Sequence, residues 1–378
     1  MSDSVLVLNA GSSSLKYRVL DLDDRAVVAG TVERVDETGW DDAFSGVASA
    51  LAEAGVDPGD LLAAGHRVVH GGDRYTEPTL VDDDVERGIE ELVALAPLHN
   101  PPALAGIRAT REAFPGLRQV AVFDTAFFAT LPEAAATYAI PRDLAQKYRI
   151  RRYGFHGTSH QFVSRAGAEL VGRDLGELNQ IVLHLGNGCS ASAVRGGVAV
   201  EASMGLTPLQ GLVMGTRSGD VDPGLHTFLH NELGMSVGDI DTLLNKQSGL
   251  KGMAGVNDFR ELEQRRAAGD ESAQLAFDVY VHRLKHYVGA YLAILGRLDL
   301  LTFTAGVGEN NPALRAAVVE GLDGLGFVVD AELNAAPSRV ARIISPDGPP
   351  IKVAVIPTNE ELAIAREAAA LLGAHTDD

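Results

Sequence analysis

Cysteine is almost absent from this sequence, since Cys189 is the single one among 378 residues. One thiol excludes an intramolecular disulfide framework and is typical of a reducing compartment. The sequence also lacks any apolar run that approaches the ~20 residues needed to span a bilayer. The short apolar stretch at residues 5–8 has no basic segment before it, which argues against a signal peptide. These absences predict a cytoplasmic protein with no membrane partner.

Positive charge is scarce, because 32 Lys and Arg residues stand against 51 Asp and Glu residues, for a net charge of −19. Nucleic acids and anionic membranes are bound by clustered positive charge, so the composition predicts no nucleic-acid partner. Any anionic substrate needs a local basic pocket instead. At about 150 residues per domain, the length predicts two or three domains.

Glycine is abundant and ends several apolar strands. Residues 5–8 and 15–20 flank the turn NAGSSS, and residues 181–185 and 191–194 flank the turn GNGCS, so each pair predicts a β-hairpin. The two turns lie nearly half the chain apart, which indicates two related halves. A third turn is expected at residues 305–310, after an apolar strand.

Helices separate these strands, which predicts an α/β architecture. Apolar positions step by three and four from Phe277 to Leu295 and predict a helix with one buried stripe. Near the C-terminus, Thr358 followed by Glu361 predicts a capping box at the start of the last helix. The basic stretch at residues 147–154 is the candidate domain boundary.

The common phosphate-binding motifs are either absent from the sequence or followed by the wrong predicted element. A P-loop requires Gly-Lys, and the sequence has no such dipeptide. Residues 186–191 match G-x-G-x-x-G/A but continue as alternating strand, which argues against a dinucleotide fold. No His-Arg-Asp of a protein kinase occurs. A nucleotide fold with hairpin phosphate loops, one in each half, remains, and ordinary turns are the alternative.

Two arginines lie among glycines, Arg67 in GHRVVHGG and Arg217 in MGTRSGD. Guanidinium groups bind carboxylate or phosphate in bidentate fashion, so both are candidate anion ligands; pairing with surface acids is the alternative. His156, between an aromatic residue and glycine, could bond a transferring phosphoryl group or be structural. Four His pairs at i, i+4 lack the Glu of H-E-x-x-H, so a zinc site is not expected.

Two acidic residues are candidates for metal or orienting roles. Asp124 ends a buried strand, where it could orient a metal, water or an arginine, or else cap a turn. Glu360 could bind Mg²⁺ with Asn9, because Mg²⁺ needs only one or two protein oxygens. Acids also favour helix N-termini, which is the alternative for Glu360.

Together, these segments resemble the acetokinase family, within the actin-like and sugar-kinase superfamily. The matching stretches run from the first strand to the last helix: NAGSSSLK (9–16), HRVVHGG (66–72), APLHNPP (96–102), FDTAF (123–127), GFHGTSH (154–160), HLGNG (184–188), MGLTPLQGLVMGTRSGDVD (204–222), FTAGVGEN (303–310) and PTNEELAIAR (357–366). The resemblance implies duplicated actin-like (ribonuclease H-like) βββαβαβα domains around a nucleotide cleft. Their expected bounds are 1–150 with 359–378, and 151–358. It also implies a homodimer.

The resemblance further implies reversible, direct in-line transfer of the γ-phosphoryl group of ATP to acetate, giving acetyl phosphate and ADP. Mg²⁺ would assist, with Mn²⁺ as an alternative, held by Asn9 and Glu360. Arg67 would bind acetate in a pocket lined by Val69, Leu98 and Pro208. Asp124, His156 and Arg217 would be the catalytic residues. The implied ATP and ADP contacts are Ser12, Ser14, Lys16, His184, Leu185, Gly186, Asn187, Gly188, Asp258, Phe259, Arg260, Gly306, Val307, Gly308, Glu309 and Asn310.

The chemistry of the candidate residues agrees with this activity. Acetate is already a carboxylate nucleophile, so no base is required, and the main difficulty is to bring two anions together. Asp124 is therefore expected to orient the metal or its waters rather than to abstract a proton. Two alternatives stay open: a kinase of propionate or butyrate, and a non-catalytic actin-like nucleotide switch or filament protein.

Overall fold

The structure, a computed structural model, describes residues 4–11, 13–35 and 39–373. The chain divides into two compact units. Unit 1 comprises Met1–Ala129, Phe155–Phe162 and Asn359–Asp378, and unit 2 comprises Thr130–Gly154 and Val163–Thr358. The expected domain bounds, 1–150 with 359–378 and 151–358, stay a prediction. A backbone bond from Tyr153 N to Gly205 O at 3.0 Å connects the end of Thr130–Gly154 to the rest of unit 2.

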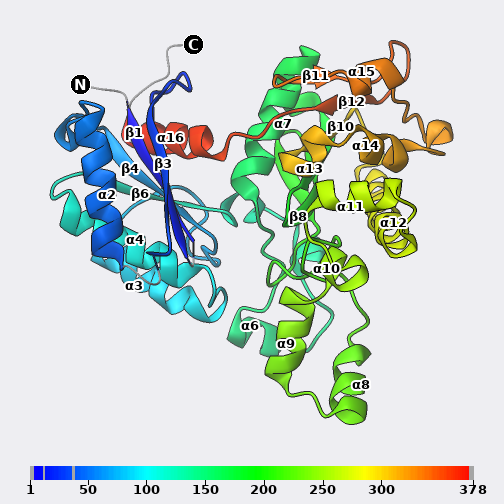
Figure 1. Ribbon diagram of the computed structural model, residues 1–378, viewed down its shortest axis with the longest axis horizontal. Coiled ribbons are helices and arrows are strands. Elements are labelled where there is room, and N and C mark those ends of the chain that lie inside the picture. The colour runs from blue at the N-terminus through cyan, green and yellow to red at the C-terminus, as the bar shows by residue number, and fades with distance from the viewer. Residues whose placement is uncertain (1–3, 12, 36–38, 374–378) are drawn as a thin grey trace. The chain divides into compact units, whose positions relative to one another are not determined.

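Unit 1 is built on a six-stranded mixed sheet in the order β3-β2-β1-β4-β6-β5 (Figure 1). Its strands are β1 (Val5–Ala10), β2 (Ser14–Leu20), β3 (Ala26–Glu33), β4 (Ala63–Val68), β5 (Thr79–Leu80) and β6 (Gln119–Phe123). Its helices are α2 (Trp40–Glu53), α3 (Asp83–Glu91), α4 (Asn100–Ala113), α16 (Glu360–Leu371) and the first part of α7 (Gly157–Val171). β1 and β2 form the predicted hairpin, and β1, β4 and β6 are parallel.

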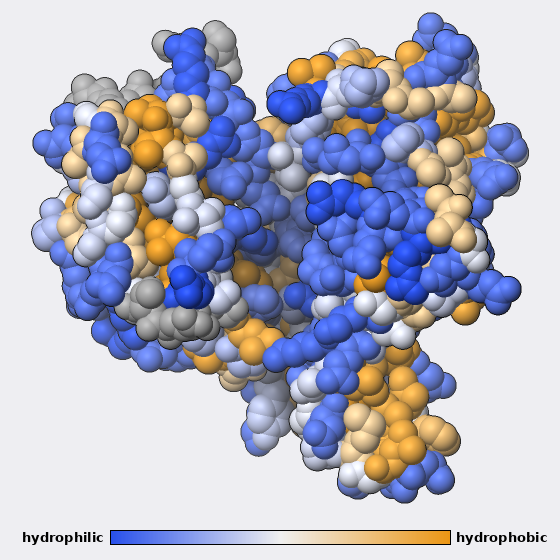
Figure 2. Space-filling view, viewed as in Figure 1, coloured by the Kyte–Doolittle hydropathy of each residue, from blue (hydrophilic) through white to orange (hydrophobic). Residues whose placement is uncertain are grey.

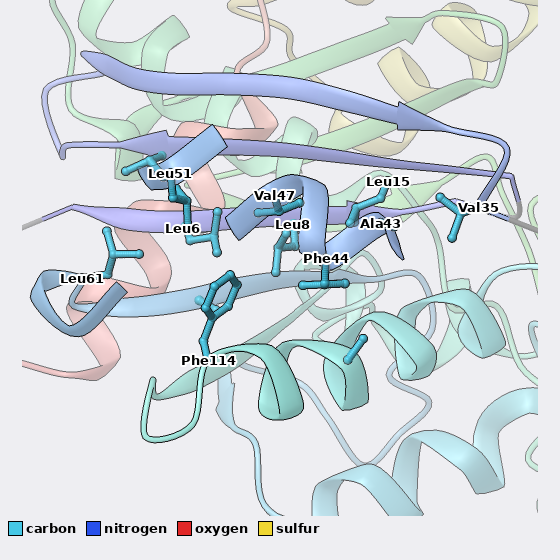
Figure 3. Close-up of a cluster of buried hydrophobic side chains, with 13 residues drawn as sticks. Leu6, Leu8, Leu15, Val35, Ala43, Phe44, Val47, Leu51, Leu61 and Phe114 are labelled. Carbon is cyan, nitrogen blue, oxygen red and sulfur yellow. The ribbon is translucent and has the colours of Figure 1, made fainter. Parts of the chain in front are cut away.

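The central strands of unit 1 are apolar on both faces because helices cover both. Alternate residues of β1 therefore point to opposite faces of the sheet. Leu6 and Leu8 pack toward α2 and α4, and Val5 and Val7 pack toward α16. Figure 3 shows the first of these clusters, in which Phe44 of α2 meets Leu8 and Phe114. Removal of a buried aromatic side chain such as Phe44 costs about 3–5 kcal/mol, so this cluster is a main source of unit 1 stability.

Unit 2 repeats the plan of unit 1. Its sheet has the order β11-β12-β10-β7-β8-β9, and β7, β10 and β12 are parallel. The two sheets have the same strand order. Three consecutive antiparallel strands (β3-β2-β1 and β9-β8-β7) are followed by two strands parallel to the last of them (β4-β6 and β10-β12). An antiparallel edge strand (β5 and β11) ends each sheet. The strands are β7 (Asn179–Leu185), β8 (Cys189–Arg195), β9 (Val198–Ala202), β10 (Leu300–Thr304), β11 (Arg342–Ile343) and β12 (Lys352–Val355). This duplication confirms the predicted α/β fold class.

The helices of unit 2 are α5 (Glu133–Ala136), α6 (Arg142–Tyr148), α8 (Gly224–Leu233), α9 (Val237–Lys246), α10 (Gly249–Ala254), α11 (Phe259–Ala267), α12 (Glu271–Leu295), α13 (Ala305–Asn310), α14 (Pro312–Val319), α15 (Ala331–Ala335) and the second part of α7. The predicted helix ending at Leu295 is the greater part of α12, and its apolar stripe is buried. Within residues 4–11, 13–35 and 39–373, no helix is both long and apolar enough to cross a membrane.

Two local predictions are wrong. Residues 305–310 form helix α13 rather than a turn, because β10 pairs with parallel neighbours and its chain must leave the sheet edge instead of folding back as a hairpin. The capping box of Thr358 and Glu361 does not form. Instead the Asn359 side chain accepts a hydrogen bond from Leu362 N at 3.0 Å and caps α16. Asn is among the most favourable N-cap residues, which moves the helix start by one position.

Candidate active site

In unit 1, the parallel strand β4 carries Arg67 on the face covered by α16. Gly65, two residues earlier on the same face, lets the helix approach closely, since a Cβ there would lie 2.7 Å from Ile364 Cγ2. The N-terminus of α16 is thereby brought to the end of β4. Its first residue, Glu360, places Oε2 3.5 Å from Arg67 Nη1.

Arg67 also forms a bidentate ion pair with Asp124, which follows β6. Arg67 Nε donates to Asp124 Oδ1 at 3.0 Å, and Nη2 donates to Oδ2 at 2.8 Å. Asp124 is 1% exposed. Burial alone would lower the pKa of Arg67, but Asp124 and Glu360 raise it well above its ordinary value. The guanidinium is therefore permanently charged, and Asp124 fixes its orientation.

The backbone of Asp124 anchors the segment that carries His156. Gly157 N donates to Asp124 O at 2.8 Å, and a Cβ on Gly157 would lie 2.3 Å from that oxygen, so only glycine fits there. His156 itself has φ 61°, a left-handed conformation that costs a non-glycine residue roughly 1–3 kcal/mol. The fold thus holds His156 in a strained conformation beside the residue bonded to Asp124.

Asn9 and Lys16 are partners across the β1–β2 hairpin. Together with Glu361 they line a hollow of about 320 Å³ on the face of the sheet. Ser14 begins β2, and its carbonyl accepts from Gly11 N at 2.8 Å. Ser12 lies outside the described residues.

The three predicted pocket residues are divided between the units. Val69 is half-buried just after β4, and Leu98 is 53% exposed before α4, both in unit 1. Pro208 belongs to unit 2, where its carbonyl accepts a hydrogen bond from Arg217 Nη1 at 3.3 Å. The acetate pocket stays a prediction.

Unit 2 contains a cavity of about 690 Å³ that brings three of the predicted nucleotide segments together. These are the turn after β7, the start of α11 and helix α13. Its lining residues are Gly186, Asn187, Gly215, Leu250, Asn257, Asp258, Phe259, Arg260, Gly306, Val307, Asn310 and Asn311. The volume is that of a site for a small organic ligand.

Other predicted nucleotide contacts adjoin the lining residues in the sequence but do not line the cavity themselves. His184 and Leu185 are buried in β7, and Gly188 O accepts from Gly186 N at 3.1 Å to close the turn. Gly308 is buried in α13. Glu309 accepts a hydrogen bond from Thr358 N at 3.2 Å.

Four lining residues were not predicted from the sequence: Gly215, Leu250, Asn257 and Asn311. Asn257 and Asn311 adjoin predicted motifs, so extending each motif by one residue would have found them. Gly215 lies within the MGTRSGD segment that was singled out for Arg217, so that motif offered a signal for it, whereas Leu250 has no local signal and is placed by tertiary bonds. Gly215 N donates to Asn187 O at 3.0 Å, and Leu250 N donates to Met214 O at 3.0 Å.

At the rim of the cavity, Asp258 caps α11 and pairs with Arg260, whose Nε lies 3.0 Å from Asp258 Oδ1. The hydrogen bonds from Arg260 lower the pKa of Asp258 to about 2. Both side chains are exposed, so this pair adds little to stability. It leaves charged and polar atoms available at the entrance.

Arg217 differs from Arg67 in having no acidic partner among the described residues. Its Nη1 donates to Pro208 O, and Met214 Sδ lies 3.7 Å away. Burial lowers the pKa of Arg217 from its ordinary value. A half-buried guanidinium without a counter-ion is unfavourable unless an anion arrives.

Comparison with known proteins agrees with this geometry. The sequence pattern of the acetokinase family matches residues 39–366. The chain belongs to this family. It is 54% identical to an acetate kinase of Streptomyces coelicolor, with 98% of this chain and 97% of that protein covered.

Solved structures of the family have the same fold. An acetate kinase of Porphyromonas gingivalis superposes with a TM-score of 0.93 at 40% identity, and covers 98% of this chain and 100% of its own. A propionate kinase of Francisella tularensis superposes with a TM-score of 0.92 at 42% identity, and covers 97% and 99% respectively. The resemblance seen in the sequence motifs is therefore confirmed for the family and for the fold.

Proposed function

We propose that this chain acts as an acetate kinase, which transfers the γ-phosphoryl group of ATP to acetate and forms acetyl phosphate and ADP. Membership of the acetokinase family and the close acetate kinase relatives support this activity. The structural observation that carries it is Arg217, a half-buried cation for which the described part of the chain supplies no acidic partner. It lies two residues from Gly215 in the lining of the 690 Å³ cavity.

The reaction needs no proton transfer. A carboxylate oxygen of acetate forms a bond to the γ-phosphorus while the bond from that phosphorus to the bridging oxygen breaks, and the electron pair leaves with ADP. Charge spreads over the equatorial oxygens of the transferring group, so cations placed beside them lower the barrier. In this proposal Arg217 and His156 stabilise that charge.

Arg67 is the proposed ligand of the acetate carboxylate, and the family resemblance implies Val69, Leu98 and Pro208 as the lining of the acetate pocket. The bidentate pair of Arg67 with Asp124 suggests that Asp124 acts by orienting the guanidinium. This modifies the expected role of Asp124, from a group that orients the metal or its waters to one that orients an arginine. Neither role involves abstraction of a proton.

Asn9 and Glu360 are the proposed magnesium ligands. An amide oxygen and a carboxylate suit a hard cation, and the Glu360 side chain is 20% exposed and thus accessible. When bound with ATP, Mg²⁺ or Mn²⁺ would neutralise phosphate charge. Lys16 and Ser14, with the turn after β7, α13 and the start of α11, are the proposed ATP contacts.

A hydroxylamine trap tests the activity directly, because hydroxylamine converts acetyl phosphate to acetohydroxamate, which forms a coloured complex with ferric iron. We expect hydroxamate to form only when the chain, ATP, Mg²⁺ and acetate are all present. ATP binding without hydroxamate would contradict the proposal and favour a nucleotide switch instead.

A second candidate acceptor is propionate, because a propionate kinase is among the similar structures. The side chains that would set pocket depth, Val69, Leu98 and Pro208, are all of moderate size. Comparison of kcat/KM for acetate, propionate and butyrate decides between them. We expect acetate to have the highest value.

We also propose that the chain forms a homodimer. Unit 2 exposes apolar side chains on α8 and α9, namely Phe228, Leu233 and Val237, visible as an apolar area in Figure 2. Light scattering after size exclusion should give twice the 39.8 kDa of one chain. A mass of one chain would contradict this. A cytoplasmic location stays a prediction of the sequence.

A further inference from the structure

The loop of unit 2 that carries Arg217 is closed at its base by two reciprocal hydrogen bonds. Asp220 N donates to Gly211 O at 2.9 Å, and Gly211 N donates to Asp220 Oδ1 at 3.0 Å. Gly219 makes the close approach feasible. It has φ 69°, and a Cβ there would lie 2.5 Å from Gly211 O. The ten residues from 211 to 220 therefore form a closed loop with Arg217 near its end.

Further bonds hold the inside of this loop against the cavity. Met214 N donates to Arg217 O at 3.1 Å, and Gly215 N donates to Asn187 O at 3.0 Å. The loop is thus connected to the phosphate-type turn after β7. A small shift at its base would move the Arg217 guanidinium relative to the cavity.

Residues outside the loop also hold it: Ser218 N donates to Leu244 O at 3.0 Å, and a tyrosine of the long helix α12 contacts Asp220 at the base itself. Tyr287 Oη donates to Asp220 Oδ2 at 2.6 Å, so both carboxylate oxygens of Asp220 are occupied. Burial and the neighbouring Asp220 raise the pKa of Tyr287, which keeps its hydroxyl protonated as the donor. Hydrogen bonds to a carboxylate are short and about twice as strong as neutral ones.

We propose that Tyr287 is a positioning residue for phosphoryl transfer, which acts through Asp220 to place Arg217. The inference rests on the proposed function and deepens it. Tyr287 does not touch Arg217, so its effect passes along the chain from Asp220 through Gly219 and Ser218. Without its hydroxyl, Asp220 Oδ2 loses its donor and the base of the loop can shift.

Helix α12 offers a matched control one turn further on. Tyr291 is 2% exposed, and its hydroxyl has no hydrogen-bond partner among the described residues. Its ring packs edge-on against Tyr287 at 5.6 Å between centroids. Tyr287→Phe and Tyr291→Phe therefore remove the same atom from the same helix, but only the first breaks a hydrogen bond.

The experiment measures steady-state kinetics of acetyl phosphate formation for both variants. A misplacement of catalytic groups by an ångström can cost up to about 100-fold. We expect Tyr287→Phe to lower kcat roughly 10-fold or more while both KM values stay within about twofold. Tyr291→Phe should keep kcat within about twofold. Tyr287→Phe should unfold at a lower temperature than Tyr291→Phe, because only it loses a hydrogen bond to a carboxylate. The kinetics are therefore compared at a temperature at which circular dichroism shows both variants to be folded, which separates positioning from loss of fold.

A second variant checks the route through Asp220. Asp220→Asn removes one acceptor from the same pair, so the effects of Asp220→Asn and Tyr287→Phe on kcat should be less than additive in the double variant. Additive effects would overturn the inference, as would an unchanged kcat in Tyr287→Phe or an equal loss in Tyr291→Phe. If the unsubstituted chain makes no acetyl phosphate, the proposed function itself fails.

Discussion

Arg67 and Asp124 pair side by side, with Arg67 Nε 3.0 Å from one carboxylate oxygen and Nη2 2.8 Å from the other. The third nitrogen, Nη1, faces Glu360. Two acidic residues thus hold one guanidinium in a fixed plane. Asp124 occupies the edge formed by Nε and Nη2, so an added carboxylate would have to bind at the edge formed by Nη1 and Nη2. Arg217, by contrast, has no acidic partner among the described residues.

The first prediction concerns substrate binding by Arg67. Arg67→Ala should raise the acetate KM sharply and leave the ATP KM less affected, since the acetate carboxylate would lose its proposed ligand. It should also lower thermal stability, because Asp124 would be left buried without its partner. Asp124→Asn separates the two effects: it keeps the guanidinium but loosens its orientation, and should lower kcat. An unchanged acetate KM in Arg67→Ala would show that another residue holds the carboxylate.

Removal of the other arginine should act on the rate. Contacts to charge that develops in the transition state are worth about 3 kcal/mol or more, so Arg217→Ala should lower kcat by roughly 100-fold or more. Arg142→Ala is a suitable control, because Arg142 is 80% exposed in the same unit. Near-normal turnover by Arg217→Ala would remove this residue from the mechanism.

A metal dependence is expected for Glu360. Glu360→Gln keeps the size of the side chain but removes a charged oxygen ligand, so more Mg²⁺ should be needed for half-maximal rate. Titration of the rate with Mg²⁺ at saturating ATP measures this. Glu91→Gln, at an exposed helical position of the same unit, should leave the curve unchanged. Superimposable curves for Glu360→Gln and Glu91→Gln would argue against the metal role.

Stability should depend on pH through His66, which is 3% exposed on β4. Burial lowers the pKa of His66 from 6.5 to about 4. The folded state therefore favours the neutral form of His66. The contribution of neutral His66 to the free energy of unfolding is present above pH 6.5 and is lost as pH falls toward 4. Between pH 7 and 5 this amounts to about 2 kcal/mol.

Urea unfolding at the two pH values tests the His66 prediction by difference. His66→Gln cannot titrate, so its loss of stability between pH 7 and 5 should be smaller than that of the unsubstituted chain. Equal losses would show that carboxylates alone cause the pH dependence.

Local patterns predicted the local structure well. The hairpins around residues 9–14 and 186–190 form because alternating apolar strands flank short turns, and all information for them is contiguous. The stripe from Phe277 to Leu295 is likewise buried as expected. The predicted start of α16 was wrong by one residue, because the capping-box spacing of Thr358 and Glu361 was followed, whereas Asn359 is the better N-cap residue.

Contacts between residues far apart in the chain could not be predicted from the sequence. Nothing local shows that Arg67 pairs with Asp124, which lies 57 residues away. Parallel neighbours of β10 turned residues 305–310 into a helix, and only the sheet order reveals those neighbours. Tyr287 is not one of the apolar positions of the α12 stripe, and nothing local in the sequence links its hydroxyl to Asp220, 67 residues distant. Such pairs are created by topology.

The central claim is that the γ-phosphoryl group passes directly from ATP to the acetate carboxylate, with cationic side chains supplying the stabilisation. The most direct measurement is the stereochemical course at a γ-phosphorus made chiral with oxygen isotopes. Direct in-line transfer predicts inversion of configuration in acetyl phosphate. Retention would indicate two successive transfers through a phosphorylated side chain and would contradict the account.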